Sequence, residues 1–223
     1  MGPGLTATAE VHVVIDPALS EGHSVSLLSV TGGPSILAIT PRRANELGFS
    51  AAERVDPVRL TGAIADAGIT LNDADHLFYL TVAEHAALRD EPVFAGARQL
   101  TMADEPLFAQ FTADAPGDDL DEAFVELDHW LVFGTFVDGR LVSAASMYPW
   151  DNSTLADLGV ITLPDYRGLG LGRATVRAIS AHAISLGYEP QYRCRLDNAP
   201  SVALAASAGF TLFGDWHVIV GGD

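Results

Sequence analysis

A glycine-rich stretch at residues 158–173 carries residue types and a spacing that suit the binding of an anion. Its motif residues are Arg167, Gly168, Gly170 and Gly172, and Arg173 follows them directly. Glycines adopt backbone conformations that a Cβ atom would forbid, and they let a ligand approach the backbone closely. Successive backbone N–H groups in such a loop, where it opens a helix, form a concave site for anions. The two arginines can fork onto phosphate oxygens, so the stretch predicts a diphosphate ligand.

The spacing of these residues separates the classes of diphosphate site. A nucleotide loop of the Walker type ends in Gly-Lys-Ser/Thr, and the chain contains no lysine. The dinucleotide pattern G-x-G-x-x-G also fails, because its last position is Arg173 when counted from Gly168 and Thr175 when counted from Gly170. The pattern that fits is R-x-x-G-x-G over residues 167–172, which resembles the coenzyme A loop of the Gcn5-related N-acetyltransferases. The alternative is a strand–turn–helix junction in which the glycines serve only close packing.

A second motif lies downstream, from Asn198 to Phe210, with the pattern N-x-x-S-x-x-L-x-x-x-x-G-F. Asn198 and Pro200 mark the start of a short helix, and Gly209 marks its end. The pattern resembles the second coenzyme-binding motif of the same family, at the expected distance after the first. The alternative is that Asn198 and Ser201 only cap the helix.

The resemblance to this family, and to its branch often called FR47-like, implies acetyl transfer from acetyl-CoA to a primary amine in a ternary complex. In the fold that it implies, two neighbouring parallel strands diverge at the glycine loop and leave backbone groups that bind the pantetheine arm. A backbone N–H of the strand before the loop then polarises the thioester carbonyl, as an oxyanion hole does. The residues that we expect to hold the coenzyme are Val160, Ile161, Thr162, Arg167, Gly168, Leu169, Gly170, Leu171, Gly172, Arg173, Asn198 and Ser201.

The attacking amine must lose a proton, because an alkylamine has a pKa of about 10.4. Asp157 is the candidate general base, since some family members carry a carboxylate facing the acceptor on this strand. Alternation along a strand places Asp157 on the same face as Gly159 and Ile161. The alternative is an ordinary hydrogen-bonded or solvent-facing aspartate. Three further carboxylates are candidates on the acceptor side, and each is more simply part of a solvated acidic loop: Glu122, Glu126 and Asp128.

One position departs from the family pattern. Many members carry a tyrosine directly after the leucine of the second motif, where it protonates the departing thiolate, and this chain has Ala205. Other residues could serve, and the alternatives are Tyr166, Tyr192, Ser201 and His217. The thiolate could also leave without a dedicated acid, because a thiol pKa of about 8.5 makes it a fair leaving group near neutral pH. A third interpretation is an unusual acceptor or a binding module that has lost catalysis.

The order of elements predicts an α/β (α+β) fold with a mixed, partly antiparallel sheet. We expect the acetyltransferase domain over residues 98–223, preceded by a smaller α/β part over residues 1–97 that is either a degenerate copy of the same fold or a lid. In the larger part, strands are expected at 99–102, in a hairpin over 130–147 that turns at Asp138-Gly139, and at 155–163, 191–196, 211–213 and 216–220, with helices over 104–112, 171–186 and 198–209. In the smaller part, strands are expected over 11–15, 25–30, 35–39 and 76–80, and helices over 41–47 and 56–67.

Composition limits the classes of function. The net charge of −17 argues against binding to nucleic acid or to an anionic membrane and suits a cationic small-molecule acceptor. We expect a cytoplasmic protein, because the sequence shows neither an apolar span of membrane length nor a secretory signal, and its single cysteine, Cys194, excludes an intramolecular disulfide.

The histidines are scattered and cysteine pairs are absent, so we expect no metal site. The expected partner is a small amine, and a homodimer is left open.

Two other functions compete with acetylation of a small amine. A non-catalytic acyl-CoA-binding or sensor protein would bind acetyl-CoA and turn nothing over. A protein N-acetyltransferase would need an open groove for a peptide. Release of CoA in the presence of a suitable amine would distinguish a catalyst from a sensor.

Overall fold

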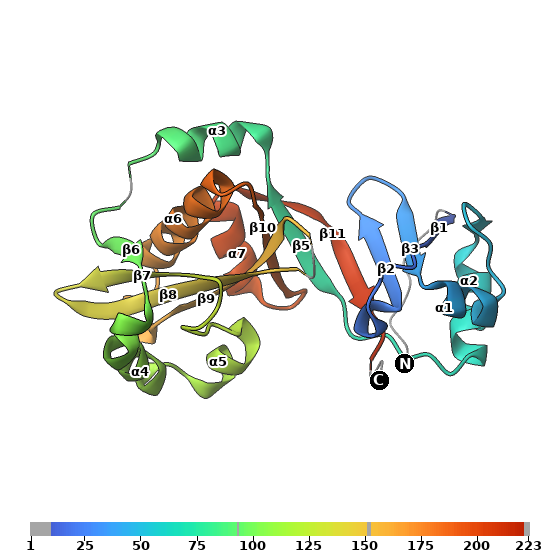
Figure 1. Ribbon diagram of the computed structural model, residues 1–223, viewed down its shortest axis with the longest axis horizontal. Helices are drawn as coiled ribbons and strands as arrows, with labels where there is room; N and C mark the ends of the chain where they lie inside the picture. Colours follow the sequence, from blue (N-terminus) through green and yellow to red (C-terminus); the bar gives the residue numbers. More distant parts are fainter. Residues whose placement is uncertain (1–9, 93, 151–152, 221–223) are drawn as a thin grey trace. The chain divides into compact units, whose positions relative to one another are not determined.

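The structure is a computed structural model that describes residues 10–92, 94–150 and 153–220 (Figure 1). The chain divides into two compact units. The first comprises Met1–Leu77, Cys194–Asp197 and Leu212–Asp223, and the second comprises Phe78–Arg193 and Asn198–Thr211. This border lies before the predicted one at 97/98, and two later segments join the first unit. We describe each unit by itself.

The first unit contains strands in the order β4-β1-β3-β2-β11. Its elements are β1 (Val11–Ile15), η1 (Glu21–His23), β2 (Val25–Val30), β3 (Ser35–Ile39), α1 (Pro41–Leu47), β4 (Arg54–Val55), α2 (Pro57–Asp66) and β11 (Phe210–Val218), whose first two residues belong to the second unit. β1 runs parallel to β3, and the other neighbours are antiparallel. Thr40 and Asp56 cap the two helices, and each is followed by a proline whose fixed φ suits a first helical turn. The two helices and alternate strand residues share one apolar core, and the expected elements over 11–67 are confirmed.

The C-terminal segment forms one strand where two were predicted, so that prediction is wrong. β11 runs without interruption through Gly214 and Asp215, the pair that we interpreted as a turn. Gly214 pairs with Val30 of β2, and a Cβ atom at Gly214 would overlap the carbonyl oxygen of Ser29. This glycine therefore allows the close approach of a neighbouring strand, and glycine serves turns and close approaches alike.

The second unit is built on a mixed sheet with the order β10-β9-β8-β7-β6. Its strands are β6 (Ala97–Gln99), β7 (Leu131–Val137), β8 (Arg140–Pro149), β9 (Leu155–Thr162) and β10 (Glu189–Arg195), and β5 (Asp75–Leu80) crosses the border between the units. β9 and β10 are parallel, whereas β6 to β9 are antiparallel. The hairpin between β7 and β8 turns at Asp138 and Gly139, both with positive φ, as predicted. The expected α/β class with a mixed, partly antiparallel sheet is therefore confirmed.

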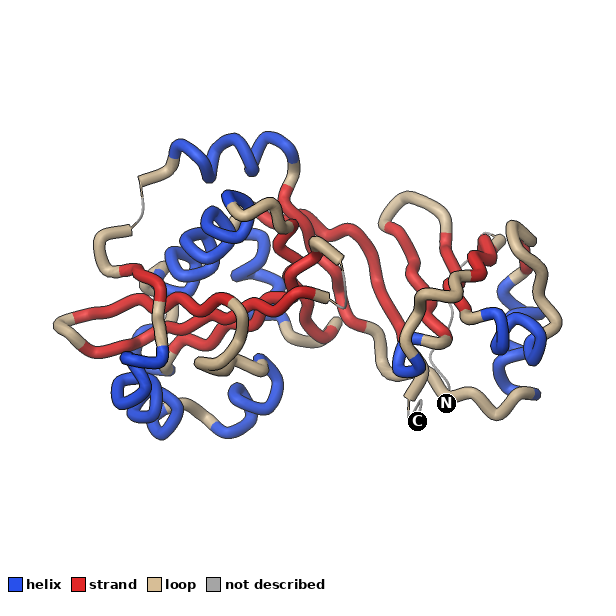
Figure 2. The backbone as a smooth tube through the Cα atoms, in the orientation of Figure 1, coloured by secondary structure: helices blue, strands red, loops and turns tan. Residues whose placement is uncertain are grey.

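Helices cover both faces of this sheet (Figures 1 and 2). α6 (Leu171–Ser185) and α7 (Ala199–Ser207) lie on one face, and α4 (Glu105–Asp114) and α5 (Gly117–Ala123) lie on the other. On the first face, the Thr175 hydroxyl of α6 bonds that of Thr135 in β7 at 2.7 Å. On the second face, Phe108 and Phe111 of α4 pack with Ile161 of β9 in one buried cluster. Within the described residues, no helix combines the length and apolar character needed to cross a membrane.

Three short elements of the second unit differ from the prediction. α5 and α3 (Val82–Asp90) were not predicted, because one lies in an acidic stretch and both have weak apolar periodicity. The expected strand over 99–102 ends at Gln99, and Met102–Asp104 forms a 3-10 turn, η2. In that turn Thr101 and Asp104 cap each other's backbone N–H groups, which closes the strand early.

The contact between α5 and β9 depends on Gly159. A Cβ atom there would overlap the carbonyl oxygen of Ala123, the last residue of α5. We expect Gly159→Ala to lower the free energy of unfolding by about 1–3 kcal/mol, since an added methyl group must push the end of α5 away. Urea unfolding measures this value. Gly117→Ala is the matched control, because a Cβ at that α5 glycine meets no described atom within 4 Å. Equal stability of both variants would contradict this packing.

Candidate active site

β9 and β10 lie side by side as parallel strands and then separate. The last pair in their register is Leu158 with Tyr192, although β9 continues to Thr162 and β10 to Arg195. On its other edge, β9 stays paired with β8 as far as Thr162. From Gly159 onward, the edge of β9 that faces β10 therefore has no strand partner among the described residues. Unpaired backbone groups at such an edge are available to an extended ligand, which can bind as an added strand.

The glycine loop connects this open edge to the N-terminus of α6. It follows η3 (Pro164–Tyr166), and Gly168 and Gly170 have φ values of 73° and 78°, in the region that favours glycine. Among the described atoms, none lies within 4 Å of a Cβ built on either glycine. Gly170 is the N-cap of α6, so the N–H groups of the first turn point out of the helix without intrahelical acceptors. Helix N-termini of this kind bind phosphate groups.

Gly172 brings the two sequence motifs together. It lies in the first turn of α6, and a Cβ there would come within 2.8 Å of Thr162 Oγ1 and 3.5 Å of Leu204 Cδ2. Leu204 is the leucine of the second motif and belongs to α7. At the start of α7, Asn198 accepts a hydrogen bond from the N–H of Ser201 at 3.1 Å. The capping contact that we gave as the alternative for Asn198 is thus present, beside the glycine loop.

The two arginines of the loop differ in their surroundings. Arg167 donates from Nε to the carbonyl oxygen of Thr162 at 3.0 Å, and its guanidinium group forms an ion pair with Asp119 of α5. Arg173 is exposed and has no ion-pair partner within the described part of the chain. Arg173 is therefore the cation of the loop that is free to meet an anion, whereas Arg167 would first have to exchange a carboxylate for a phosphate.

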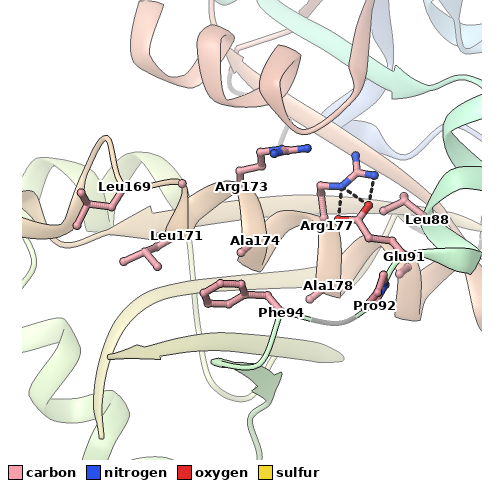
Figure 3. A pocket seen from close by; sticks show the side chains of 12 residues that line it. Leu88, Glu91, Pro92, Phe94, Leu169, Leu171, Arg173, Ala174, Arg177 and Ala178 are labelled. Atoms are coloured by element: carbon pink, nitrogen blue, oxygen red, sulfur yellow. Dashed lines mark hydrogen bonds and ion pairs between the residues drawn. The ribbon is translucent and has the colours of Figure 1, made fainter. Parts of the chain in front are cut away.

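A cavity of about 300 Å³ adjoins the loop on the side of α3. Its wall contains Leu169, Gly170 and Leu171 of the loop, Ala174 and Ala178 of α6, and Leu88, Pro92 and Phe94. Figure 3 shows Phe94 against the face of α6 that carries the two alanines. Arg177 closes one end through an ion pair with Glu91, which lowers the pKa of that carboxyl group. The cavity is at the small end of the range for ligand sites.

Asp157, the candidate base, belongs to a row of polar side chains across the sheet. It is only 4% exposed. Its two neighbours in register, Tyr148 on β8 and Gln191 on β10, donate to Oδ2 and Oδ1, each at 3.1 Å. Arg193 donates to Oδ2 at 2.9 Å, and the Tyr79 hydroxyl donates to the side-chain oxygen of Gln191. The row lies one residue before the point where β9 and β10 separate.

In this row, Asp157 accepts hydrogen bonds and its neighbours Tyr148, Gln191 and Arg193 donate them. Burial, with the nearby charge of Asp157 as a second cause, raises the pKa of Tyr148 and of Tyr79 to about 12. Both tyrosines are therefore protonated near neutral pH and act as donors. Asp157 is a paired carboxylate, which matches the hydrogen-bonded alternative. The role of general base stays a prediction.

Sequence reasoning missed an aromatic cluster next to this row. Phe124, directly after α5, and His129, before β7, both contact the ring of Tyr148, with ring centres 5.8 and 5.1 Å away. His129 Nδ1 lies 2.8 Å from the Ser146 hydroxyl, and its Nε2 lies 3.9 Å from Glu126. The register of β8 with β9, which places Tyr148 opposite Asp157, could not be read from the sequence. Nothing in the sequence pattern marked Phe124.

The candidate proton donors fall at different places. The Tyr192 hydroxyl lies 2.8 Å from Ser201 Oγ, at the last pair before the strands separate. Ala205 is buried one helical turn after Ser201 on α7. Tyr166 packs at the core beneath α4, and His217 lies in the first unit, where it bonds a backbone carbonyl. Of the other predicted carboxylates, Glu122 accepts from the side-chain amide of Asn198 at 3.2 Å. The described residues contain no group of three or more side chains that could hold a metal ion.

Known proteins resemble this chain in sequence or in fold. The curated "Uncharacterized N-acetyltransferase YdfB" of Bacillus subtilis (strain 168) is 33% identical over 67 residues, which are 30% of this chain and 26% of that protein. An acetyltransferase from the GNAT family of Colwellia psychrerythraea has a TM-score of 0.53 and 16% identity, covering 82% of this chain and 75% of its own. A GCN5-related N-acetyltransferase of Kribbella flavida has a TM-score of 0.50 and 18% identity, covering 74% and 64%. These structures share the fold, and the chain spans about a quarter of the length of the curated relative.

The sequence model of the Acetyltransferase (GNAT) family matches residues 98–210. That range includes the separating strands, the glycine loop and the helix of the second motif, and it is slightly more than half of the 223 residues. The chain belongs to the Acetyltransferase (GNAT) family.

Proposed function

We propose that this protein is an acetyl-CoA-dependent N-acetyltransferase that acts on the primary amine of a small, cationic acceptor. The observation that carries the proposal is the separation of β9 from β10 directly before a glycine loop that caps α6. The family uses acetyl-CoA, and this geometry offers an open strand edge to the pantetheine arm and free N–H groups to the diphosphate. We propose that the cavity beside Leu169, which adjoins the loop, receives the adenine ring.

The reaction that we propose is a direct transfer within a ternary complex. The lone pair of the neutral amine attacks the thioester carbonyl carbon, the C–S bond breaks, and the amine proton passes to a base. Asp157 is the proposed base, acting on the face of β9 that α5 covers. The hydroxyl groups of Tyr192 and Ser201 are hydrogen-bonded to each other, and Ser201 lies one helical turn before Ala205 on α7. We propose that this pair donates a proton to the departing thiolate.

The charge of the acceptor follows from the residues around α5. This helix and the segment after it carry Asp118, Asp119, Asp121, Glu122, Glu126 and Asp128. A negative field of this kind attracts a cationic substrate and repels an anionic one. We propose placement in the FR47-like branch, on the resemblance of the C-terminal half. We also propose a cytoplasmic protein whose partner is a small amine, and a homodimer is left open.

Coenzyme binding is the first test. We expect Gly170→Val to weaken acetyl-CoA binding at least tenfold in calorimetry, because the added side chain fills the space beside the loop. Gly187→Val is the matched control, since Gly187 has a φ of 86°, open space around its Cβ position and a place at the other end of α6. Both variants carry similar backbone strain, so their melting temperatures should fall alike. No binding of acetyl-CoA by the unaltered protein would overturn the proposal.

The role of Asp157 is tested by measuring the rate of amine acetylation. With the best amine from a screen of small cations, we expect Asp157→Asn to lower kcat by about 10²–10⁴, the range of general base catalysis, without changing acetyl-CoA affinity. Asp165→Asn, at an exposed aspartate of η3, is the control. Coenzyme binding without turnover of any amine would instead favour the sensor.

A further inference from the structure

Three aromatic rings pack together on the face of the sheet that α5 covers. The ring centres of Phe124 and His129 are 4.9 Å apart with an interplanar angle of 64°. Phe124 meets Tyr148 at 5.8 Å and 82°, and His129 meets Tyr148 at 5.1 Å and 57°. We call these three residues the aromatic cluster. Phe124 meets both partners edge to face, and the His129–Tyr148 pair is tilted.

Phe124 is the outermost ring, and its backbone is strained. It is 52% exposed, and its φ of 47° lies in the left-handed region, which costs a non-glycine residue about 1–2 kcal/mol. A glycine would satisfy the turn after α5 without this cost and without exposing a large apolar side chain. Neither the turn nor the core therefore explains a phenylalanine at this position. Strained residues of this kind gather at ligand sites.

The charges around the aromatic cluster are negative. The Glu126 carboxylate lies 3.9 Å from His129 Nε2, and Asp128 also acts electrostatically on the ring. Burial nonetheless lowers the pKa of His129, so its imidazole is neutral near pH 7. The described cation beside Tyr148 is Arg193, and it is paired with Asp157. A half-exposed aromatic ring with carboxylates near the cluster suits a cation.

The cluster is also connected to the residues at which β9 and β10 separate. The Ser146 hydroxyl holds His129 Nδ1 at 2.8 Å, and Ser146 is the β8 residue opposite Gly159. Gly159 is the first residue of β9 beyond the last pair with β10. Tyr148 is bonded in turn to Asp157. The cluster is thus anchored on β8, one strand away from the open edge of β9 on which we place the thioester.

We propose that the aromatic cluster, with Glu126 at its edge, binds the ammonium group of the acceptor through cation–π contact, so that the acceptor is an alkylammonium ion. This proposal rests on the proposed function for the chemistry that follows binding. The binding itself needs no coenzyme. The aromatic cluster would draw an alkylammonium ion to the site, where the base must remove its proton before attack.

Binding of choline to the full chain tests the proposal without acetyl-CoA. Choline is a quaternary ammonium ion, and its neutral isostere 3,3-dimethylbutan-1-ol has the same shape without the charge. In an NMR titration we expect choline to bind and the neutral isostere not to bind. Phe124→Leu should weaken choline binding about 3- to 10-fold, the range expected for loss of one cation–π contact. Glu126→Gln should also weaken it.

Phe213→Leu is the matched control, because Phe213 is a 42% exposed phenylalanine in the first unit. It should bind choline as the unaltered protein does, and the melting temperatures of all variants report their folding. Equal binding of choline and its isostere, or unchanged binding by folded Phe124→Leu, would overturn the proposal. These outcomes are separate from the acetyl-CoA titration, whose failure would overturn the proposed function while leaving a cation site in place.

Discussion

The candidate site depends on the separation of two parallel strands, β9 and β10. Leu158 and Tyr192 are the last partners, and both strands continue beyond them. A backbone edge without a partner inside a protein costs free energy unless another group satisfies it. The loop, the helix N-terminus and the polar row all lie within a few residues of this point. On its other edge, β9 stays paired with β8 from Ala156 to Thr162. The strand is therefore still held in the sheet where it leaves β10.

Three glycines make this arrangement sterically allowed, each in a different way. Gly170 supplies a left-handed N-cap that turns the chain into α6. Gly172 lets the first turn of that helix rest against Thr162 and Leu204. Gly159 lets the end of α5 lie directly on β9. The first two belong to the recognised motif, whereas the third acts on the opposite face of the sheet.

Local signals explain what could be predicted from the sequence. The R-x-x-G-x-G pattern located the loop because its requirements are local, and the Asp138-Gly139 turn located the hairpin for the same reason. Gly214 was misassigned because a glycine inside a strand and a glycine in a turn look alike when the partner strand is distant in sequence. The surroundings of Asp157 could not be predicted, since Tyr148, Gln191 and Tyr79 come from three other strands. Phe124 was missed because α5 has little apolar periodicity and its strained turn carries no glycine.

The ion pair between Arg167 and Asp119 joins the coenzyme loop to the helix on the other face of the sheet. A diphosphate that recruits Arg167 must compete with this carboxylate, and the exchange would leave Asp119 without its counter-ion. The released negative charge would then sit on α5, the helix whose last turn leads into Phe124. Loading of the loop would thereby make the opposite face more attractive to a cation, and by thermodynamic linkage a bound cation would ease release of Arg167 from Asp119. The two substrates would then strengthen each other's binding through the charge of Asp119, without a hinge.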